Sequence, residues 1–218
     1  MAARFCCAAA QSICSRTERT MGIRRKLFGP SQNEIWQQLC SEIGADFVRG
    51  GFWRGNRVQA RVGEWMVTLD AYTVSTGKSH VTYTRMRAPY VNVDGFRFTL
   101  YRKTFFSGIG KLLGMQDIEI GDPEFDRDFI IKGNSETKTM ALFMNETIRH
   151  LIQAQPNIHL EIKDDDGIFG VGFPEGVDEL RFQVVGLIKD IERLKALYEL
   201  FAEVLQTLCR IGSAYEKD

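Results

Sequence analysis

Residues 46–103 alternate apolar and polar side chains over most of their length. A period of two is typical of β-strands that bury one face, because successive side chains point to opposite sides of a sheet. Val58, Ala60 and Val62 alternate first, Gly63-Glu64 can turn the chain, and a second strand then begins at Trp65. Ser75–Ser79 (STGKS) is expected to be a loop before a third strand that ends near Val91.

The segment Asn92–Gly95 predicts a tight hairpin, since Asp-Gly favours two-residue turns. Phe96, Phe98 and Leu100 would form the return strand, paired with the strand before the turn. The sequence therefore predicts a meander of about four antiparallel strands, with one apolar face and one wetter face.

Helices are marked by their caps. Ser31 and Glu34 form a capping box, and the helix that follows should run to Ile43 and stop at Gly44. Ser135 and Asn145 are expected to cap two shorter helices. Asp190 should cap the longest helix, which has a broad apolar stripe. Short strands are expected at 118–120, 129–132, 158–162 and 180–184.

These elements predict an α+β fold in which an antiparallel β-meander sheet packs on several helices, the last of them a long C-terminal helix. Residues 30–218 are expected to form a single α+β domain. Residues 1–29 are expected to be a disordered leader or a spurious extension, so the chain starts at Met1 or at Met21. A transit-like leader and a secretory signal are alternatives, although the apolar part of the latter is short.

Charge and cysteine content narrow the function. The 28 basic and 28 acidic residues cancel, and a dedicated nucleic-acid binder usually has a basic excess, so no nucleic acid is expected. The five cysteines are odd in number and lack metal-ligand spacing, which favours a reducing, cytoplasmic setting. No apolar stretch is long enough for a transmembrane segment.

No cofactor motif is complete. Ser107–Lys111 resembles part of a phosphate-binding loop, but Phe105 stands where the first glycine is needed and Leu112 where a hydroxyl is needed. Asp164–Gly167 does not have the spacing of an EF-hand and is better explained as a turn. The three histidines are too far apart in sequence to form a helical metal pair. The sequence therefore predicts no cofactor and favours a protein that is not an enzyme.

One acidic cluster supports an alternative. Paired carboxylates can perform acid–base work or hold a metal. A divalent-metal-dependent hydrolase would use the acids of residues 117–128, which are Asp117, Glu119, Asp122, Glu124, Asp126 and Asp128.

A basic and aromatic constellation is the candidate binding site. Tyr83, Arg85 and Arg87 share one strand face, and the paired strand is expected to supply four more residues, which are Arg97, Tyr101, Arg102 and Lys103. Such a surface suits phosphates, anionic lipid or an acidic partner. The favoured function is a non-catalytic binding or protein-interaction module. A homo-oligomer is allowed by the broad stripe of the last helix. Weak contact with an anionic surface, together with Arg24–Lys26, would make the chain a peripheral membrane protein.

The stretch Gly121–Ile152 resembles the signature of a bacterial domain family of unknown function. That signature reads F-D-x-x-F, a short strand, and two helices, and the matching positions run from Phe125 to Ile152: Phe125, Asp126, Phe129, Leu142, Phe143, Ile148, Leu151 and Ile152. The resemblance implies no activity, and its mostly apolar positions are expected to lie in the core. Related chains often have membrane spans before this domain, and this sequence has none.

Overall fold

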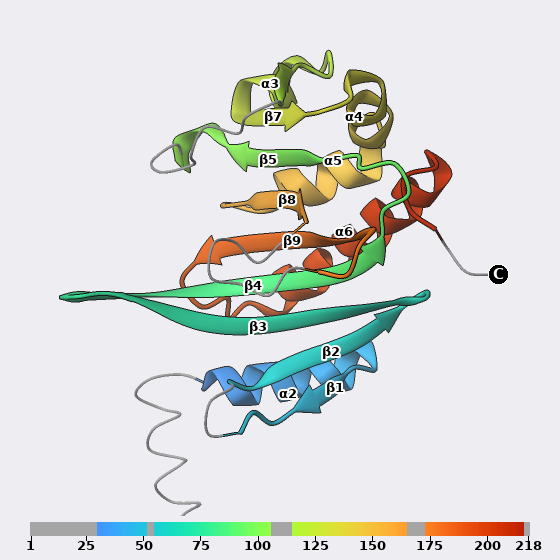
Figure 1. The fold of residues 1–218 in the computed structure, drawn as a ribbon. Coiled ribbons are helices and arrows are strands. Elements are labelled where there is room, and N and C mark those ends of the chain that lie inside the picture. The colour runs from blue at the N-terminus through green and yellow to red at the C-terminus, as the bar shows by residue number, and fades with distance from the viewer. Residues whose placement is uncertain (1–29, 52–54, 106–114, 165–172, 216–218) are drawn as a thin grey trace, which may run out of the picture.

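A computed structural model describes residues 30–51, 55–105, 115–164 and 173–215 (Figure 1). Nine strands form one antiparallel sheet in the order β1-β2-β3-β4-β9-β8-β5-β7-β6. The strands are β1 (Asp46–Val48), β2 (Arg57–Val62), β3 (Trp65–Thr76), β4 (Ser79–Val91), β5 (Phe98–Arg102), β6 (Gln116–Ile118), β7 (Phe129–Gly133), β8 (His159–Lys163) and β9 (Val177–Val185). The predicted α+β class, with its antiparallel sheet and long last helix, is confirmed.

The helices begin where their caps predict. Ser31 and Glu34 form the capping box of the first, and Gly44 ends it with a φ of 68°. Ser135, Asn145 and Asp190 cap three others with their side chains. The described helices are α2 (Gln32–Ile43), α3 (Pro123–Asp128), α4 (Glu136–Phe143), α5 (Glu146–Gln153) and α6 (Ile191–Arg210), with a 3-10 turn η1 (Lys103–Phe105).

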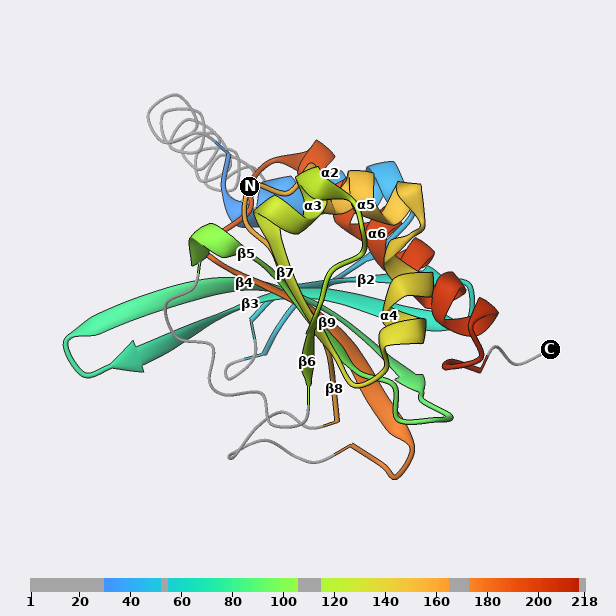
Figure 2. The ribbon, with the colours of Figure 1, turned by 90° about the horizontal axis from the view of Figure 1, so that it is seen from above.

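The helices lie on one face of the sheet (Figure 2). Side chains at alternate strand positions point toward them, among them the fully buried Val67, Leu69 and Met86. Against these strands pack Trp36 and Leu39 of α2 and the apolar stripe of α6. We call this the helix face of the sheet, and the opposite side the outer face.

The apolar residues of the bacterial signature do lie in the core, whereas Asp126 is only partly buried. Phe125 and Phe129 have ring centroids 4.6 Å apart, and Phe143 packs edge-on against Phe98 at 5.1 Å. Phe125 belongs to α3, a short helix that the sequence pattern did not predict. Aromatic contacts of this kind add to the stabilisation that burial provides.

The expected hairpin at Asn92–Gly95 is wrong. β4 pairs with β3 and β9, whereas β5 pairs with β7 and β8, so two strands separate β4 from β5. The turn itself forms, since the side-chain Oδ1 of Asn92 accepts from Gly95 N at 3.1 Å. The Asn92 amide, however, donates to Asp178 of β9 at 2.6 Å, and this contact helps β9 to occupy the edge of β4.

The expected loop Ser75–Ser79 is mostly strand. β3 and β4 stay paired as far as Thr76 and Ser79, so only Gly77 and Lys78 turn the chain. Gly77 has a φ of 71°, a backbone conformation that a glycine adopts without steric cost. The hairpin is therefore longer and its turn tighter than the sequence suggested.

Replacing Gly133 with alanine should destabilise the protein. A Cβ at Gly133 would enter van der Waals space of the Thr139 hydroxyl, and would lie 3.1 Å from Cδ1 of Ile118. Thr139 is fully buried and its hydroxyl donates to the Ser135 carbonyl, so it has little freedom to move. We expect a loss of about 1–3 kcal/mol in the free energy of unfolding, as for other overpacked cores.

Urea unfolding measures that loss. The matched control is Gly51→Ala, since an added Cβ at Gly51 has open space around it. Equal stability of the two variants would contradict the close packing of β7 on α4.

Candidate functional site

The outer face of the sheet has a row of charged side chains. Because strand side chains alternate, the positions between the buried apolar ones point away from the helices. On neighbouring strands these positions include Asp70, Arg85, Arg181 and Glu161, and strand register sets Arg85 opposite Asp70 and Arg181 opposite Glu161. The outer face is therefore where the predicted basic site must be sought.

The structure brings together only part of the predicted basic and aromatic set. Tyr83, Arg85 and Arg87 do share the outer face of β4, as the alternation predicted. The other four residues are not on a paired strand, because β9 and β8 lie between β4 and β5. The seven residues therefore do not form one surface.

The four residues near β5 have separate roles. Arg97 forms ion pairs with Asp164 at 2.8 Å and Asp178 at 3.4 Å. Tyr101 is 1% exposed on β5, and burial raises the pKa of its hydroxyl. The side chain of Arg102 lies 4.4 Å over the Phe129 ring and donates to the carbonyl of Gln155 at the end of α5.

Lys103 donates from Nζ to the Asp126 carbonyl at 2.8 Å, in the first turn after β5. Like Arg102, Lys103 is hydrogen-bonded to a backbone carbonyl. These contacts are structural, and they leave the two side chains less available to a phosphate or a lipid headgroup.

The two arginines of β4 are also paired. Arg85 makes two parallel bonds to the Asp70 carboxylate, at 2.9 and 3.0 Å. Arg87 reaches the same carboxylate at 2.7 Å and lies 3.6 Å from Glu179. The fork-to-carboxylate geometry gives strong, directional bonds. The positive charge that the sequence suggested is therefore largely neutralised within the outer face.

The row of charges continues across the centre of the sheet. Glu179 is 2% exposed and Arg181 6% exposed, and the two are 2.9 Å apart. Glu161 on β8 lies 3.4 Å from His159. Burial acts to raise the pKa of Glu161, but the close contact with His159 and the nearby positive charges outweigh it and hold that pKa below its ordinary value.

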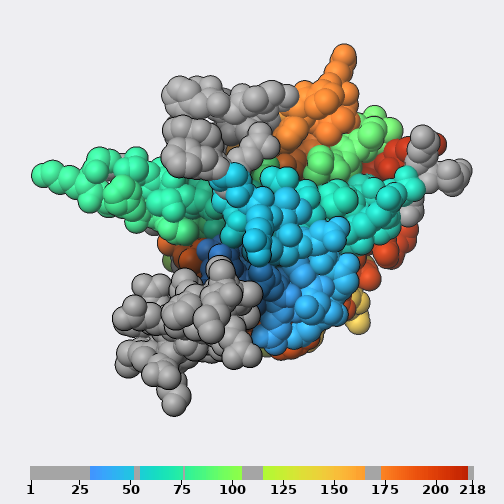
Figure 3. Space-filling model, turned by 90° about the horizontal axis from the view of Figure 1, so that it is seen from below, coloured from blue at the N-terminus to red at the C-terminus, as the bar shows by residue number. Residues whose placement is uncertain are grey.

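Beyond this row, the β3–β4 hairpin leaves the sheet as a projecting arm, which we define as residues 71–84. Pairing of β2 with β3 ends at Asp70, and continuous pairing of β9 with β4 ends at Thr84. Beyond Thr84, Gly186 forms an isolated bridge to Tyr83 and donates its N–H to the Thr82 carbonyl. β3 and β4 remain paired with each other out to Thr76 and Ser79. Figures 2 and 3 show the arm extending well past the rest of the described chain.

The two faces of the arm differ. Tyr72 and Tyr83 stack on the outer face with their centroids 5.3 Å apart, and the Arg85 guanidinium lies 4.7 Å over Tyr72. Val74 and Val81 pair next along the same face, and Val74 is 40% exposed. Burial raises the pKa of the Tyr72 hydroxyl, which donates to Gln183 at 2.7 Å.

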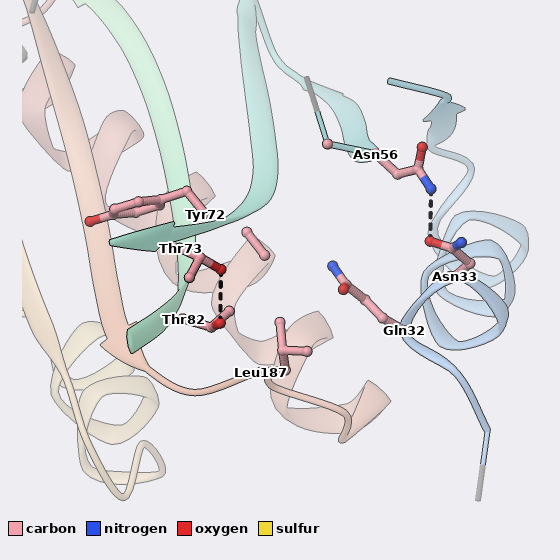
Figure 4. A pocket seen from close by; sticks show the side chains of 9 residues that line it. Gln32, Asn33, Asn56, Tyr72, Thr73, Thr82 and Leu187 are labelled. Carbon is pink, nitrogen blue, oxygen red and sulfur yellow. Dashed lines mark hydrogen bonds between the residues drawn. The ribbon is translucent and has the colours of Figure 1, made fainter. Parts of the chain in front are cut away.

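The opposite face of the arm has hydroxyls and borders a cavity. Thr73 and Thr82 are hydrogen-bonded across the strands at 2.9 Å. Below them an open cavity of about 330 Å³ lies between the base of the arm, the start of α2 and the loop before β2 (Figure 4). Its polar lining includes Gln32, Asn33 and Asn56, and the last two are bonded to each other at 2.8 Å.

The acids of residues 117–128 are largely committed to local structure. Asp117 pairs with Lys132 at 3.1 Å, and Asp122 caps α3. The Asp126 carboxylate accepts from the backbone N–H groups of Ile120 and Gly121, and Asp128 pairs with Arg127 at 2.9 Å. Within the described ranges, no three His, Cys, Asp or Glu side chains gather as a metal site.

Several predicted features fall outside the described residues. These are the basic cluster Arg24–Lys26, the glycine-rich Ser107–Lys111, most of the Asp164–Gly167 turn, and the leader at 1–29. Among the described helices, none is long and apolar enough to cross a membrane.

The arm and the acids that neutralise β4 were not anticipated. A signal for the arm was present, since residues 71–76 are uncharged and rich in β-branched side chains. Alternation along β3 places Asp70 on the face opposite Leu69, but only the register between β3 and β4 shows that it meets Arg85 and Arg87.

We expect Glu161 to contribute stability at neutral pH that acid removes. Its pKa in the folded state is below the ordinary 4.5, so the unfolded chain binds the proton more readily. The contribution is present above the ordinary pKa and is lost as pH falls through the lower one. Between about pH 5 and pH 3, the free energy of unfolding should therefore fall more steeply for the wild type than for Glu161→Gln. Glu64→Gln, in an exposed turn, should follow the wild type. Parallel curves for the wild type and Glu161→Gln would contradict this role.

We expect Asp126→Ala to destabilise the protein because two backbone N–H groups lose their acceptor. The loss should be about 1–3 kcal/mol, and smaller for Asp126→Asn, which keeps one acceptor oxygen.

Thermal unfolding with and without Mg²⁺, Mn²⁺ or Ca²⁺ also tests the hydrolase alternative. A bound metal would raise the melting temperature of the wild type by mass action and both variants would abolish the shift.

Comparison with known proteins adds information about the fold. No protein-family model matches the sequence, and no curated protein sequence matches it. The likeness of residues 125–152 to a bacterial domain family therefore rests on those residues alone. The fold is similar to the crystal structure of the mycobacterial trehalose monomycolate transport factor A, TtfA, with a TM-score of 0.50 and 8% sequence identity. The similarity covers 81% of this chain and 95% of that chain, and it concerns the fold alone.

Proposed function

We propose that the chain is a non-catalytic protein-interaction module that binds its partner through the arm. The observation that carries the proposal is the continuation of β3 and β4 beyond both neighbouring strands. A two-stranded hairpin is at best marginally stable in water on its own. A hairpin that projects this far without covering strands gains stability when a partner packs on it.

The composition of the arm supports this function. Between Asp70 and Lys78 the chain has no charged residue. Natural proteins protect strand edges with charges, prolines, bulges or short length. The two outermost strands of the sheet, β1 and β6, are three residues long and each has an aspartate. The β3 edge of the arm has neither of these protections.

The outer face of the arm also suits a protein partner. Tyrosine and arginine are enriched at protein interfaces, since each combines a large contact area with hydrogen-bonding groups. Here Tyr72, Tyr83 and Arg85 are already packed against one another, so little side-chain entropy would be lost on binding. The exposed Val74 adds an apolar contact at the end of this cluster.

The two alternatives from the sequence have less structural support. A metal-dependent hydrolase would need carboxylates that are free to bind an ion, whereas Asp117, Asp122 and Asp126 bond to other groups of the chain. Attachment to an anionic membrane would need unpaired positive charge, whereas Arg85 and Arg87 share the carboxylate of Asp70.

A reducing setting such as the cytoplasm fits the described thiols. Cys40 is buried and is not part of a disulfide. Burial of Cys40 raises the pKa of its thiol, which lowers its reactivity. We therefore do not expect Cys40 to serve as a nucleophile.

A photo-crosslinking amino acid at Val74 tests the proposed function. In cells, irradiation should give a discrete adduct of defined mass from position 74, because the side chain is exposed on the arm. The matched control is Met144, an apolar side chain that is 61% exposed at the end of α4. Adducts of the same kind from both positions, or none from position 74, would contradict a partner site on the arm.

A further inference from the structure

We propose that the partner at the β3 edge of the arm is a second copy of this chain, and that two arms pair antiparallel about a twofold axis at Val74. This inference rests on the proposed function and names its partner. It depends on which backbone groups point outward from β3, and the described hydrogen bonds determine that.

The first step concerns Thr82. Its carbonyl accepts from Gly186 N at 2.7 Å, and so points away from β3. In antiparallel strands, the N–H and C=O of one residue point to the same side, and opposite residues are alternately bonded and not bonded to each other. Thr82 is opposite Thr73, so these two are not bonded through their backbones. The N–H and C=O of Thr73 therefore face the outer edge of β3.

The alternation extends this result to neighbouring residues. Ser75 and Ala71, two positions away on either side, must also direct their backbone groups to the edge. The carbonyl of Ala71 confirms this direction, since it lies 3.5 Å from the Cβ position of Gly55, in the loop before β2. In the arm, β2 no longer pairs with β3, so the edge groups of Thr73 and Ser75 have no described strand beside them.

These groups are self-complementary. When Val74 lies on a twofold axis, Thr73 is opposite Ser75 of the second copy, and Ser75 is opposite Thr73 of that copy. Both are bonded pairs, so four backbone hydrogen bonds form. Val74 is then opposite its own copy in a non-bonded pair, where side chains approach most closely. A twofold interface of this kind uses the same patch on both molecules.

Charge and chain geometry favour a second copy over other occupants. Residues 71–76 are uncharged and the whole chain has no net charge, so two copies do not repel each other. The valine pairs of the two arms would form one apolar cluster between the two tyrosine stacks. In this register the turn of the second copy reaches Gly55 and Asn56, at the mouth of the polar cavity. β2 begins directly beyond, which stops the pairing from extending and so limits the register.

Pairing through two short edges buries less surface than the roughly 1,200 Å² of a stable interface. The dimer should therefore be weak, and sedimentation velocity should show association that increases from about 1 to about 100 µM protein. A chain that stays monomeric over this range overturns the inference.

A disulfide test locates the twofold axis. Opposed residues in a non-bonded antiparallel pair lie within the Cα distance that a disulfide spans. Val74→Cys should therefore give a covalent dimer on mild oxidation. The matched control is Val81→Cys, which lies on the same face one strand farther from the edge, and should give no more dimer than the wild type with its own cysteines. A dimer from Val81→Cys and none from Val74→Cys overturns the proposed edge.

Two proline variants test the backbone bonds. Ser75→Pro removes an edge N–H that no described strand uses, and should weaken association at least about tenfold. His80→Pro is the matched control, since His80 is opposite Ser75 and its backbone faces the other edge of the arm. Melting temperatures are measured first, so that only folded variants are compared. Equal association of the two variants overturns the inference.

The crosslinking experiment separates this inference from the proposed function. An adduct between Val74 and a second copy supports both. An adduct with a different protein, in the absence of a dimer, overturns the inference and leaves the arm as a partner site. No adduct of either kind contradicts the proposed function itself.

Discussion

The sheet depends on one strand, β9, which pairs along both of its edges. On one side it meets β4 over eight residue pairs, from Thr84↔Val184 to Val91↔Val177, and on the other it meets β8. Through it, the meander β1–β4 and the group β5–β8 become one sheet. Arg87 of β4 and Arg181 of β9 both lie near the Glu179 carboxylate, so the buried charges follow the same connection. Replacing that carboxylate alone would remove one partner from each arginine, and a buried charge that loses a partner is costly.

Much of the local structure follows from sequence because its causes are local. Caps such as Ser31 and Asp190 mark helix starts through bonds that span three residues. Alternation likewise identifies the strands and their buried faces. The pairing of strands is a different problem, since nothing near Asn92 reveals that β9, more than eighty residues later, takes the edge of β4. The turn at Asn92–Gly95 was predicted from its own residues, but whether the strands on either side of it pair with each other depends on a distant strand.

The candidate site shows the same division. Tyr83, Arg85 and Arg87 were placed together by periodicity, which is a property of one strand. The neutralisation of Arg85 and Arg87 by Asp70 and Glu179 depends on strand register, which involves the three strands β3, β4 and β9. The basic residues of β5 were joined to them only through a hairpin that does not exist. The arm was partly visible in the uncharged run after Asp70, although a loop was the more natural interpretation of a segment with glycine, serine and lysine.

The position of β9 in the chain also affects how the protein is made. Translation adds about 5–20 residues per second, so β9 follows the end of β4 by roughly 4–17 s. During that interval the long edge of β4, including its part of the arm, is without its later partner strand. α6, whose apolar stripe covers the sheet, is synthesised after β9. For several seconds during synthesis, the meander β1–β4 therefore lacks both β9 at its edge and α6 on its apolar face. A chaperone that binds extended apolar strands would act mainly in this interval.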